Sequence, residues 1–197
     1  MSDVIAQLEG ITKRFGQTVA LCDVDLAFRA GEVHVLAGGN GAGKSTLIRI
    51  LSGALSDYEG RLIVGGQTRR FVSPAHAAAM GVATIHQELA LIGAMSVRDN
   101  LALTSPGALF GWRRDDDDRW RAALARVGLE GVALDTPVER LPLSLRQLVE
   151  IARALTLDSS LLIMDEATSS LDDGEASRLL DQVAKLRDEG KAIVFIS

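Results

Sequence analysis

One glycine-rich stretch combines residue types that can hold a polyphosphate. Residues 38–45 read Gly-Gly-Asn-Gly-Ala-Gly-Lys-Ser, which fits the pattern G-x-x-x-x-G-K-[S/T]. Glycines let the backbone fold closely around an anion, so that successive N–H groups point at its oxygens. Lys44 can neutralise the β- and γ-phosphates, and the Ser45 hydroxyl can bind magnesium. The stretch predicts a nucleotide site made of Gly38, Gly39, Asn40, Gly41, Ala42, Gly43, Lys44, Ser45 and the following Thr46.

A second candidate group lies far downstream, where the apolar run Leu-Leu-Ile-Met at 161–164 ends in Asp165 and Glu166. In phosphoryl transfer, an acid at a strand end beside the phosphate loop holds magnesium, and another residue orients or deprotonates the attacking water. We therefore expect Asp165 to be a metal ligand and Glu166 to be a catalytic residue. Many strands end in an acid, so this pattern alone is weak evidence for a site. It becomes strong evidence together with the glycine-rich stretch.

The segments around these residues predict the elements that position them. The phosphate loop follows a strand at 32–37 and precedes a helix at 45–55 that ends near Gly53. Ser73 and Pro74 predict the N-cap and first position of a further helix. Short apolar, β-branched segments predict strands at 4–11, 18–28 and 82–85, and a hairpin at 61–71 that turns at Gly65 and Gly66.

The second half of the chain is predicted to be mainly helical before it returns to strands. Helices are expected at 96–103, 115–129 and 144–155, and the apolar strands 161–165 and 192–197 bracket a polar helix at 174–190. Continuous apolar strands separated by a helix are typical of a parallel sheet covered on both faces. The acidic run 115–118 could bind a cation, but acidic residues also favour a helix N-terminus, and we prefer that interpretation.

Composition excludes several classes of protein. A net charge of -5 argues against a surface that holds a nucleic-acid backbone. The single cysteine, Cys22, rules out an internal disulfide within these residues, and His34, His76 and His86 lack the spacing of a zinc site. The N-terminus does not have the pattern of a signal peptide, and no run of about 18 apolar residues predicts a membrane span. A reducing cytosol fits these features best.

Taken together, the motifs resemble the ATP-binding cassette (ABC) ATPases, and most of all the first cassette of the tandem ATPases of bacterial ribose-, galactose- and xylose-type importers. The resemblance covers nearly the whole chain. It implies an α/β fold of the P-loop NTPase class, with a RecA-like core, an antiparallel β subdomain and an α-helical subdomain, truncated at the C-terminus. One ABC ATPase domain would span 1–197, with the core and β subdomain at 1–89 and 158–197 and the helical subdomain at 90–157.

The same resemblance implies roles for further residues. The segment ITKRFGQTVAL is similar to the one that stacks an aromatic ring on adenine, which would be Phe15. The segment VATIHQEL is similar to the Q-loop, so Gln87 would reach magnesium and the attacking water. GGNGAGKST and LLIMDE correspond to the Walker A and Walker B motifs. SSLD at 169–172 is similar to the D-loop, which meets a second cassette.

The chain departs from the family at three places. Ala167 replaces the usual proline after the glutamate, and the chain stops before the position of the switch histidine. The stretch LPLSLRQ at 141–147 replaces the glycine-rich signature that contacts the partner cassette's ATP. In the register that we prefer, Pro142 and Ser144 stand where the family has a serine and a glycine. Ser144 and Gln147 also fit a helix capping box, which we favour over a phosphate contact, and Arg146 could still offer charge to the partner's nucleotide.

The implied function is ATP hydrolysis with Mg²⁺ that powers import of a small solute, expected to be a carbohydrate. The partners would be a second cassette, fused downstream or in a homodimer, membrane permease subunits and, indirectly, a solute-binding protein, with no nucleic acid. The protein would act at the cytoplasmic face of the membrane, and the isolated chain would hydrolyse ATP weakly or not at all. The alternative is a non-transport ABC switch, either nucleic-acid- or ribosome-associated or a regulatory ATP-binding module.

The segment just after Gln87 is the expected permease contact. Its apolar residues could dock a partner helix, but ordinary core packing explains them equally well. These residues are Leu89, Leu91, Ile92 and Met95.

Overall fold

The computed structural model describes residues 3–39, 41–85, 90–103, 116–165 and 171–196. Backbone contacts divide the chain into two compact units. The first unit comprises Met1–Thr84, Ser159–Glu166 and Arg187–Ser197, and the second comprises Ile85–Asp158 and Ala167–Leu186. The sequence-based division, with its helical subdomain at 90–157, stays a prediction.

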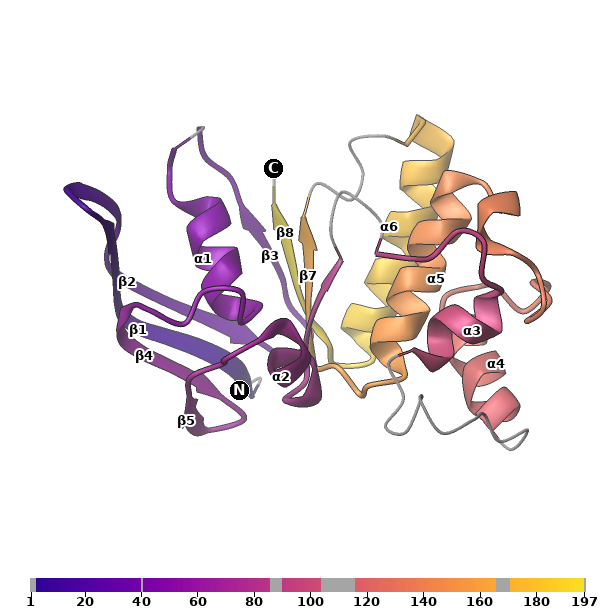
Figure 1. Cartoon of the computed structure of the whole chain (residues 1–197), viewed down its shortest axis with the longest axis horizontal. Coiled ribbons are helices and arrows are strands. Elements are labelled where there is room, and N and C mark those ends of the chain that lie inside the picture. Colours follow the sequence, from indigo (N-terminus) through magenta and orange to yellow (C-terminus); the bar gives the residue numbers. More distant parts are fainter. Residues whose placement is uncertain (1–2, 40, 86–89, 104–115, 166–170, 197) are drawn as a thin grey trace. The chain divides into compact units, whose positions relative to one another are not determined.

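The first unit contains two four-stranded sheets (Figure 1). The antiparallel sheet has the order β2-β1-β4-β5, with strands β1 (Val4–Phe15), β2 (Thr18–Arg29), β4 (Glu59–Val64) and β5 (Gln67–Arg69). Strands β4 and β5 pair directly, Val64 opposite Gln67, so the predicted hairpin turn at Gly65 and Gly66 is confirmed. Both glycines adopt positive φ, which a tight hairpin turn requires.

The other sheet has the order β3-β8-β7-β6, and its strands are β3 (Val33–Leu36), β6 (Val82–Ile85), β7 (Leu161–Asp165) and β8 (Ala192–Ile196). Strand β8 runs parallel to both β3 and β7. Leu161 to Met164 and Ala192 to Val194 are buried, as expected for strands covered on both faces. The carboxyl ends of β3, β8 and β7 therefore meet at one edge of the sheet.

Helix α1 (Lys44–Leu51) joins the two sheets into one core. Figure 1 shows it between the antiparallel sheet and strand β3. Its apolar residues fall at helical spacing, and four of them are buried in a cluster that also takes in residues of both sheets. Helix α2 (Pro74–Ala79) begins as predicted, because the Ser73 hydroxyl accepts a hydrogen bond from the His76 amide at 3.2 Å.

The second unit is helical. It contains α3 (Val97–Ala102), α4 (Asp117–Arg126), the 3₁₀ helix η3 (Val138–Arg140), α5 (Leu143–Leu155) and most of α6 (Asp173–Asp188). Asp117 and Asp118 lie in the first turn of α4, as the helix interpretation of the acidic run predicts. Asp117 also pairs with Arg98 at 3.0 Å. Within the described residues no cluster of three or more His, Cys, Asp or Glu side chains could hold a metal ion.

The start of α5 differs from the expectation. Pro142 occupies the N-cap position, and Ser144 lies inside the first turn, so the prediction that Ser144 caps this helix is wrong. The physical reason is a tertiary contact, because the Ser144 hydroxyl donates to a carboxylate oxygen of Glu175 on α6 at 2.7 Å. The predicted partner of the capping box, Gln147, is buried.

The loop at 92–96 is fixed by one buried side chain. Asn100 on α3 is completely buried; its carbonyl oxygen accepts from the Ile92 amide at 2.8 Å. Its amide group donates to the carbonyls of Ile92 and Ser96, both at 3.0 Å. Ile92 and Met95 themselves are exposed and Leu91 is half-buried. Leu89 lies outside the described residues.

Replacing Asn100 with leucine, which keeps the number and branching of the side-chain heavy atoms but removes every polar group, is expected to lower the free energy of unfolding by about 2 to 4 kcal/mol. The loss arises because the Ile92 amide would lose its acceptor, and the carbonyls of Ile92 and Ser96 would each lose one of their two donors. Urea unfolding measures it. Leu103→Ala, at a side chain that is 42% exposed, is the control and should cost less than about 1 kcal/mol. Equal losses in the two variants would contradict the role assigned to Asn100.

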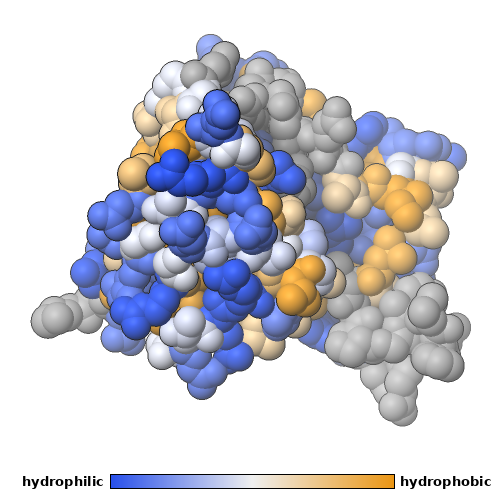
Figure 2. Space-filling model, turned by 60° about the vertical axis from the view of Figure 1, so that its left-hand side comes forward, coloured by the Kyte–Doolittle hydropathy of each residue, from blue (hydrophilic) through white to orange (hydrophobic). Residues whose placement is uncertain are grey.

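One face of the molecule carries both hydrophilic and hydrophobic side chains (Figure 2). On the face shown in Figure 2, hydrophilic side chains predominate and hydrophobic ones form small separate patches. In the described part of the chain, no helix has both the length and the apolar character needed to cross a membrane.

Candidate functional site

A cavity of about 340 Å³ opens at the carboxyl ends of the parallel strands. Asp165 at the end of β7 and Ile196 at the end of β8 are directly paired neighbours, and both line it. Ligands of open parallel sheets bind at this edge, because loops leave the strands there and helix N-termini point toward it. The cavity has the size of a small-molecule site.

The loop between β3 and α1 forms another wall of the cavity. The Ala42 amide donates to the Gly39 carbonyl at 3.1 Å, which closes a turn. Gly43 is the N-cap residue of α1, with φ of 87°, so the side of α1 that faces the cavity begins without a capping side chain. The first turn carries Lys44, Ser45 and Thr46, all of which line the cavity. The positive end of the helix dipole is therefore left for an anion.

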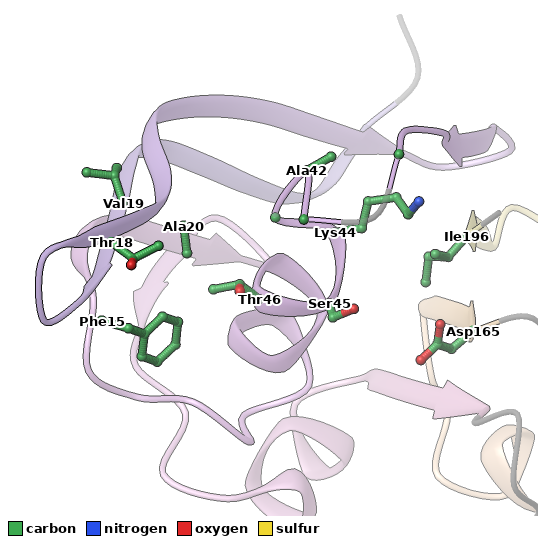
Figure 3. Close-up of a pocket in the computed structure, with 13 residues that line it drawn as sticks. Phe15, Thr18, Val19, Ala20, Ala42, Lys44, Ser45, Thr46, Asp165 and Ile196 are labelled. Carbon is green, nitrogen blue, oxygen red and sulfur yellow. The ribbon is translucent and has the colours of Figure 1, made fainter.

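Three polar groups with complementary chemistry lie along this wall. The Lys44 ammonium donates a hydrogen bond to the Gly38 carbonyl, which keeps the positive charge beside the glycine loop. The Ser45 hydroxyl and the Asp165 carboxylate line the same cavity (Figure 3). Oxygen ligands of this kind suit Mg²⁺, which binds through one or two protein oxygens together with substrate phosphates.

An aromatic ring lines the other end of the cavity. Phe15, the last residue of β1, is 45% exposed and lies on the opposite side of the cavity from Asp165 (Figure 3). A cavity with an aromatic ring at one end and a lysine and a carboxylate at the other can hold a molecule that is flat at one end and anionic at the other.

The structure thus brings together most of the residues that the motifs predict. Phe15, Gly39, Gly41, Ala42, Gly43, Lys44, Ser45, Thr46 and Asp165 line one cavity, and Gly38 contacts it through Lys44. Asn40, Gln87, Glu166, Ser169 and Ala167 lie outside the described residues.

Four lining residues were not identified from the sequence: Thr18, Val19, Ala20 and Ile196. The first three begin β2 directly after the turn that follows Phe15, so their nearness to the predicted ring was the available signal. Ile196 ends a predicted parallel strand, as Asp165 does.

The degenerate stretch 141–147 is occupied by contacts within its own unit. Arg146 folds back and donates to the carbonyls of Leu141 at 2.7 Å and Glu139 at 2.6 Å. The Ser144 hydroxyl donates to Glu175. Pro142 has no N–H to donate. The side chains of Ser144 and Arg146 are therefore already engaged.

Two charged residues of α5, the buried Glu150 and the partly buried Arg153, hold the backbone of Ala90, three positions after Gln87. Glu150 accepts from the Ala90 amide at 3.2 Å, and Arg153 donates to the Ala90 carbonyl at 2.9 Å and to Glu150 at 3.1 Å. Burial raises the pKa of Glu150 and lowers that of Arg153, and the attraction between the two charges opposes both shifts. The pair fixes both backbone groups of Ala90 to α5.

The sequence profile of the ABC transporter family matches residues 21–169. The ribose import ATP-binding protein RbsA 1 of Rhizobium johnstonii is 43% identical over 199 residues, covering 100% of this chain and 39% of that protein. The putative ribose/galactose/methyl galactoside import ATP-binding protein 1 of Burkholderia ambifaria is 44% identical, with 98% of this chain and 38% of that protein covered. The chain spans less than half the length of these relatives.

Solved structures agree with the fold. The ADP conformation of an ATP-binding cassette of an ABC transporter superposes with a TM-score of 0.88 at 27% identity, covering 100% of this chain and 82% of that one. A nucleotide-free ATP-binding cassette from an ABC transporter gives a TM-score of 0.86 at 28% identity, with coverages of 99% and 81%. The expected P-loop α/β fold is confirmed.

Proposed function

We propose, from the premise that this chain belongs to the ABC transporter family, that it binds and hydrolyses ATP to power the import of a sugar. The observation that carries the proposal is the cavity at the strand ends. A ring, a glycine loop, a helix N-terminus, a lysine and a carboxylate line it together. In this order they suit a nucleobase, a chain of phosphates and a metal ion.

The phosphates would lie on the glycine loop and the start of α1. The backbone N–H groups there and the aligned helix dipole favour negative charge. Lys44 would turn from the Gly38 carbonyl to the β- and γ-phosphates, exchanging a neutral acceptor for a charged one. Phe15 would stack on the base, so both ends of the nucleotide would be held by this chain.

Mg²⁺ fits the oxygen donors that face the cavity, Ser45 and Asp165. Gln87 is the third predicted ligand. When bound, the ion would neutralise charge on the terminal phosphates during transfer.

Hydrolysis needs a group that orients and deprotonates water. Glu166, the residue after Asp165, is proposed for this task, since it follows the strand that ends at the cavity. Gln87 is proposed to position the same water. Both roles come from the likeness of LLIMDE and VATIHQEL to the family motifs.

The relatives' names support the proposed substrate class. Those proteins are described as ribose, or ribose/galactose/methyl galactoside, import ATP-binding proteins. We propose a sugar of this class, a second cassette, permease subunits and a solute-binding protein as the working assembly. The chain would then lie at the cytoplasmic face of the membrane, held by the permease, and no nucleic-acid partner is proposed.

The test uses the full-length protein that contains this chain, reconstituted in vesicles with its permease and solute-binding protein. ATP hydrolysis should rise when ribose or galactose is added, and it should fall to background in Glu166→Gln while ATP still binds. If the rate of ATP hydrolysis does not change with any sugar, or does not depend on the permease, the non-transport switch is favoured instead.

The contacts of residues 141–146 support a further part of the proposal, an unequal pair of sites. One site would combine Lys44, Asp165 and Glu166 with the partner's signature. The other would combine the partner's phosphate loop with this chain's degenerate stretch, where Pro142 lacks an N–H and Ser144 is bound to Glu175. Such a site is expected to retain nucleotide longer and to turn it over more slowly.

The double change Pro142→Ser with Ser144→Gly in the full-length protein tests this asymmetry. It restores a hydroxyl and a free backbone N–H, each able to make a hydrogen bond to a charged phosphate. Turnover is expected to rise about threefold or more, and retained nucleotide should fall. Single-turnover hydrolysis and bound-nucleotide counts measure both quantities. Glu175→Gln, which keeps a hydrogen-bond acceptor for Ser144, is the control. Unchanged turnover and retention in the double variant would refute the asymmetry.

A further inference from the structure

Lys13 is a buried lysine that the site described above does not use. It lies on β1 two positions before Phe15. Its side chain is only 7% exposed, and lysine is almost never buried to this degree unless its charge is paired. Two groups contact the ammonium. The Asp57 carboxylate lies at 2.7 Å, and the centroid of the Phe15 ring lies 4.9 Å away.

Asp57 is itself held in place by the backbone on either side of it. Arg70, just after β5, donates to the Ser56 carbonyl at 3.1 Å and to the Tyr58 carbonyl at 2.9 Å. The Arg70 guanidinium also lies over the Tyr58 ring, 4.5 Å from its centroid. The loop that carries Asp57 is therefore fixed at both neighbouring residues, although the Asp57 side chain is 93% exposed.

The charge at Asp57 is maintained by these neighbours. The hydrogen bond and the positive charge of Lys13 lower the pKa of Asp57, and the charge of Arg70 acts in the same direction. A chain of contacts thus runs from Arg70 through Asp57 and Lys13 to the ring of Phe15.

We propose that Lys13, anchored by Asp57, is a positioning residue that fixes the Phe15 ring as the platform for the nucleotide base. The inference rests on the proposed function and adds to it the support of the base site. A phenylalanine that is 45% exposed has room to rotate, and stacking on a base requires a defined ring plane. The ammonium holds the ring through its π face by a cation–π contact. That contact occupies one face and leaves the opposite face for the base.

The experiment compares a ligand that has a base with one that has none. Lys13→Met keeps the unbranched apolar stem and removes the charge. The dissociation constants of Mg·ATP and of Mg·tripolyphosphate are measured by isothermal titration calorimetry on the wild-type chain and the variant. ATP affinity is expected to fall by about three- to tenfold, while tripolyphosphate affinity stays within about twofold. Asp57→Asn, which weakens the anchor, should change ATP affinity in the same direction and by less.

Two comparisons separate positioning from a general effect on folding. Arg14→Met removes a charge from the adjacent, exposed residue of β1 and should leave both affinities unchanged. Phe15→Ala removes the platform, and adding Lys13→Met to it should weaken ATP binding no further.

Three results would overturn the inference: unchanged ATP affinity in Lys13→Met, equal losses for the two ligands, or a Lys13 effect that persists without the Phe15 ring. If the wild-type chain binds neither ligand, the proposed function fails and the inference fails with it. If the wild type binds both and only the Lys13 comparisons fail, the proposed function survives.

Discussion

Replacing Lys44 with methionine is expected to weaken Mg·ATP binding by about thirty- to a hundredfold, which corresponds to the loss of charge-assisted hydrogen bonds to the phosphates. In the structure the ammonium donates to the Gly38 carbonyl beside the glycine loop, so it is already placed at the wall where the phosphates would bind. Isothermal titration calorimetry with ATP measures the change.

The Lys44 variant should fold normally, because its ammonium contacts an exposed loop rather than the core. Thermal unfolding without nucleotide checks this expectation. Lys185→Met is the matched control, since Lys185 is an exposed lysine on α6 that does not line the cavity. If wild type and Lys44→Met bind ATP with equal affinity, the phosphates do not bind at Lys44.

Gly43→Ala is expected to lower the free energy of unfolding by roughly 2 to 5 kcal/mol and to abolish ATP binding. Gly43 has φ of 87°, and a Cβ there would lie 2.5 Å from the Ala20 carbonyl oxygen and 2.8 Å from a methyl group of Leu21. Backbone strain and a clash against β2 therefore add together at the residue from which α1 starts. Urea unfolding and calorimetry with ATP measure the two effects.

The same loop offers a matched control for that clash. Gly41 has φ of 85°, nearly the value at Gly43, but a Cβ there would meet nothing within 4 Å. Gly41→Ala should therefore cost only the left-handed backbone strain, about 1 to 2 kcal/mol. If the two alanine variants lose the same stability, the contact of Gly43 with β2 is not what excludes a side chain.

The phosphate loop and the strand ends could be predicted because their signals are local. The glycines, Lys44 and Ser45 are consecutive in the sequence, and a strand before them with a helix after them places the loop at a sheet edge. Asp165 was predicted because it ends an apolar strand. The structure brings Asp165 and most of the loop, including Lys44 and Ser45, to one cavity.

Contacts between residues far apart in the sequence could not be predicted in this way. Lys13 and Asp57 are separated by 44 positions, and nothing in either segment indicates the pairing. Ser144 shows the opposite error. The pattern S-x-x-Q fits a capping box locally, but the Ser144 hydroxyl donates to Glu175, 31 positions away, and the helix starts one residue earlier, at Leu143, with Pro142 as its N-cap. A tertiary hydrogen bond of this kind can override the cap that a local sequence pattern predicts.

In the proposed site, the base of ATP lies beside Phe15 and its phosphates lie at Lys44. Photolabelling with 8-azido-ATP, followed by trypsin digestion and mass spectrometry, tests it most directly. Cleavage after Arg14 and Arg29 releases one peptide that carries Phe15 with Thr18, Val19 and Ala20, all of which line the cavity.

We expect this peptide to be the principal labelled product. Excess ATP should suppress its labelling, and Lys44→Met should lower the amount of label that it carries. Label on other peptides alone, or label that ATP does not displace, would contradict the account.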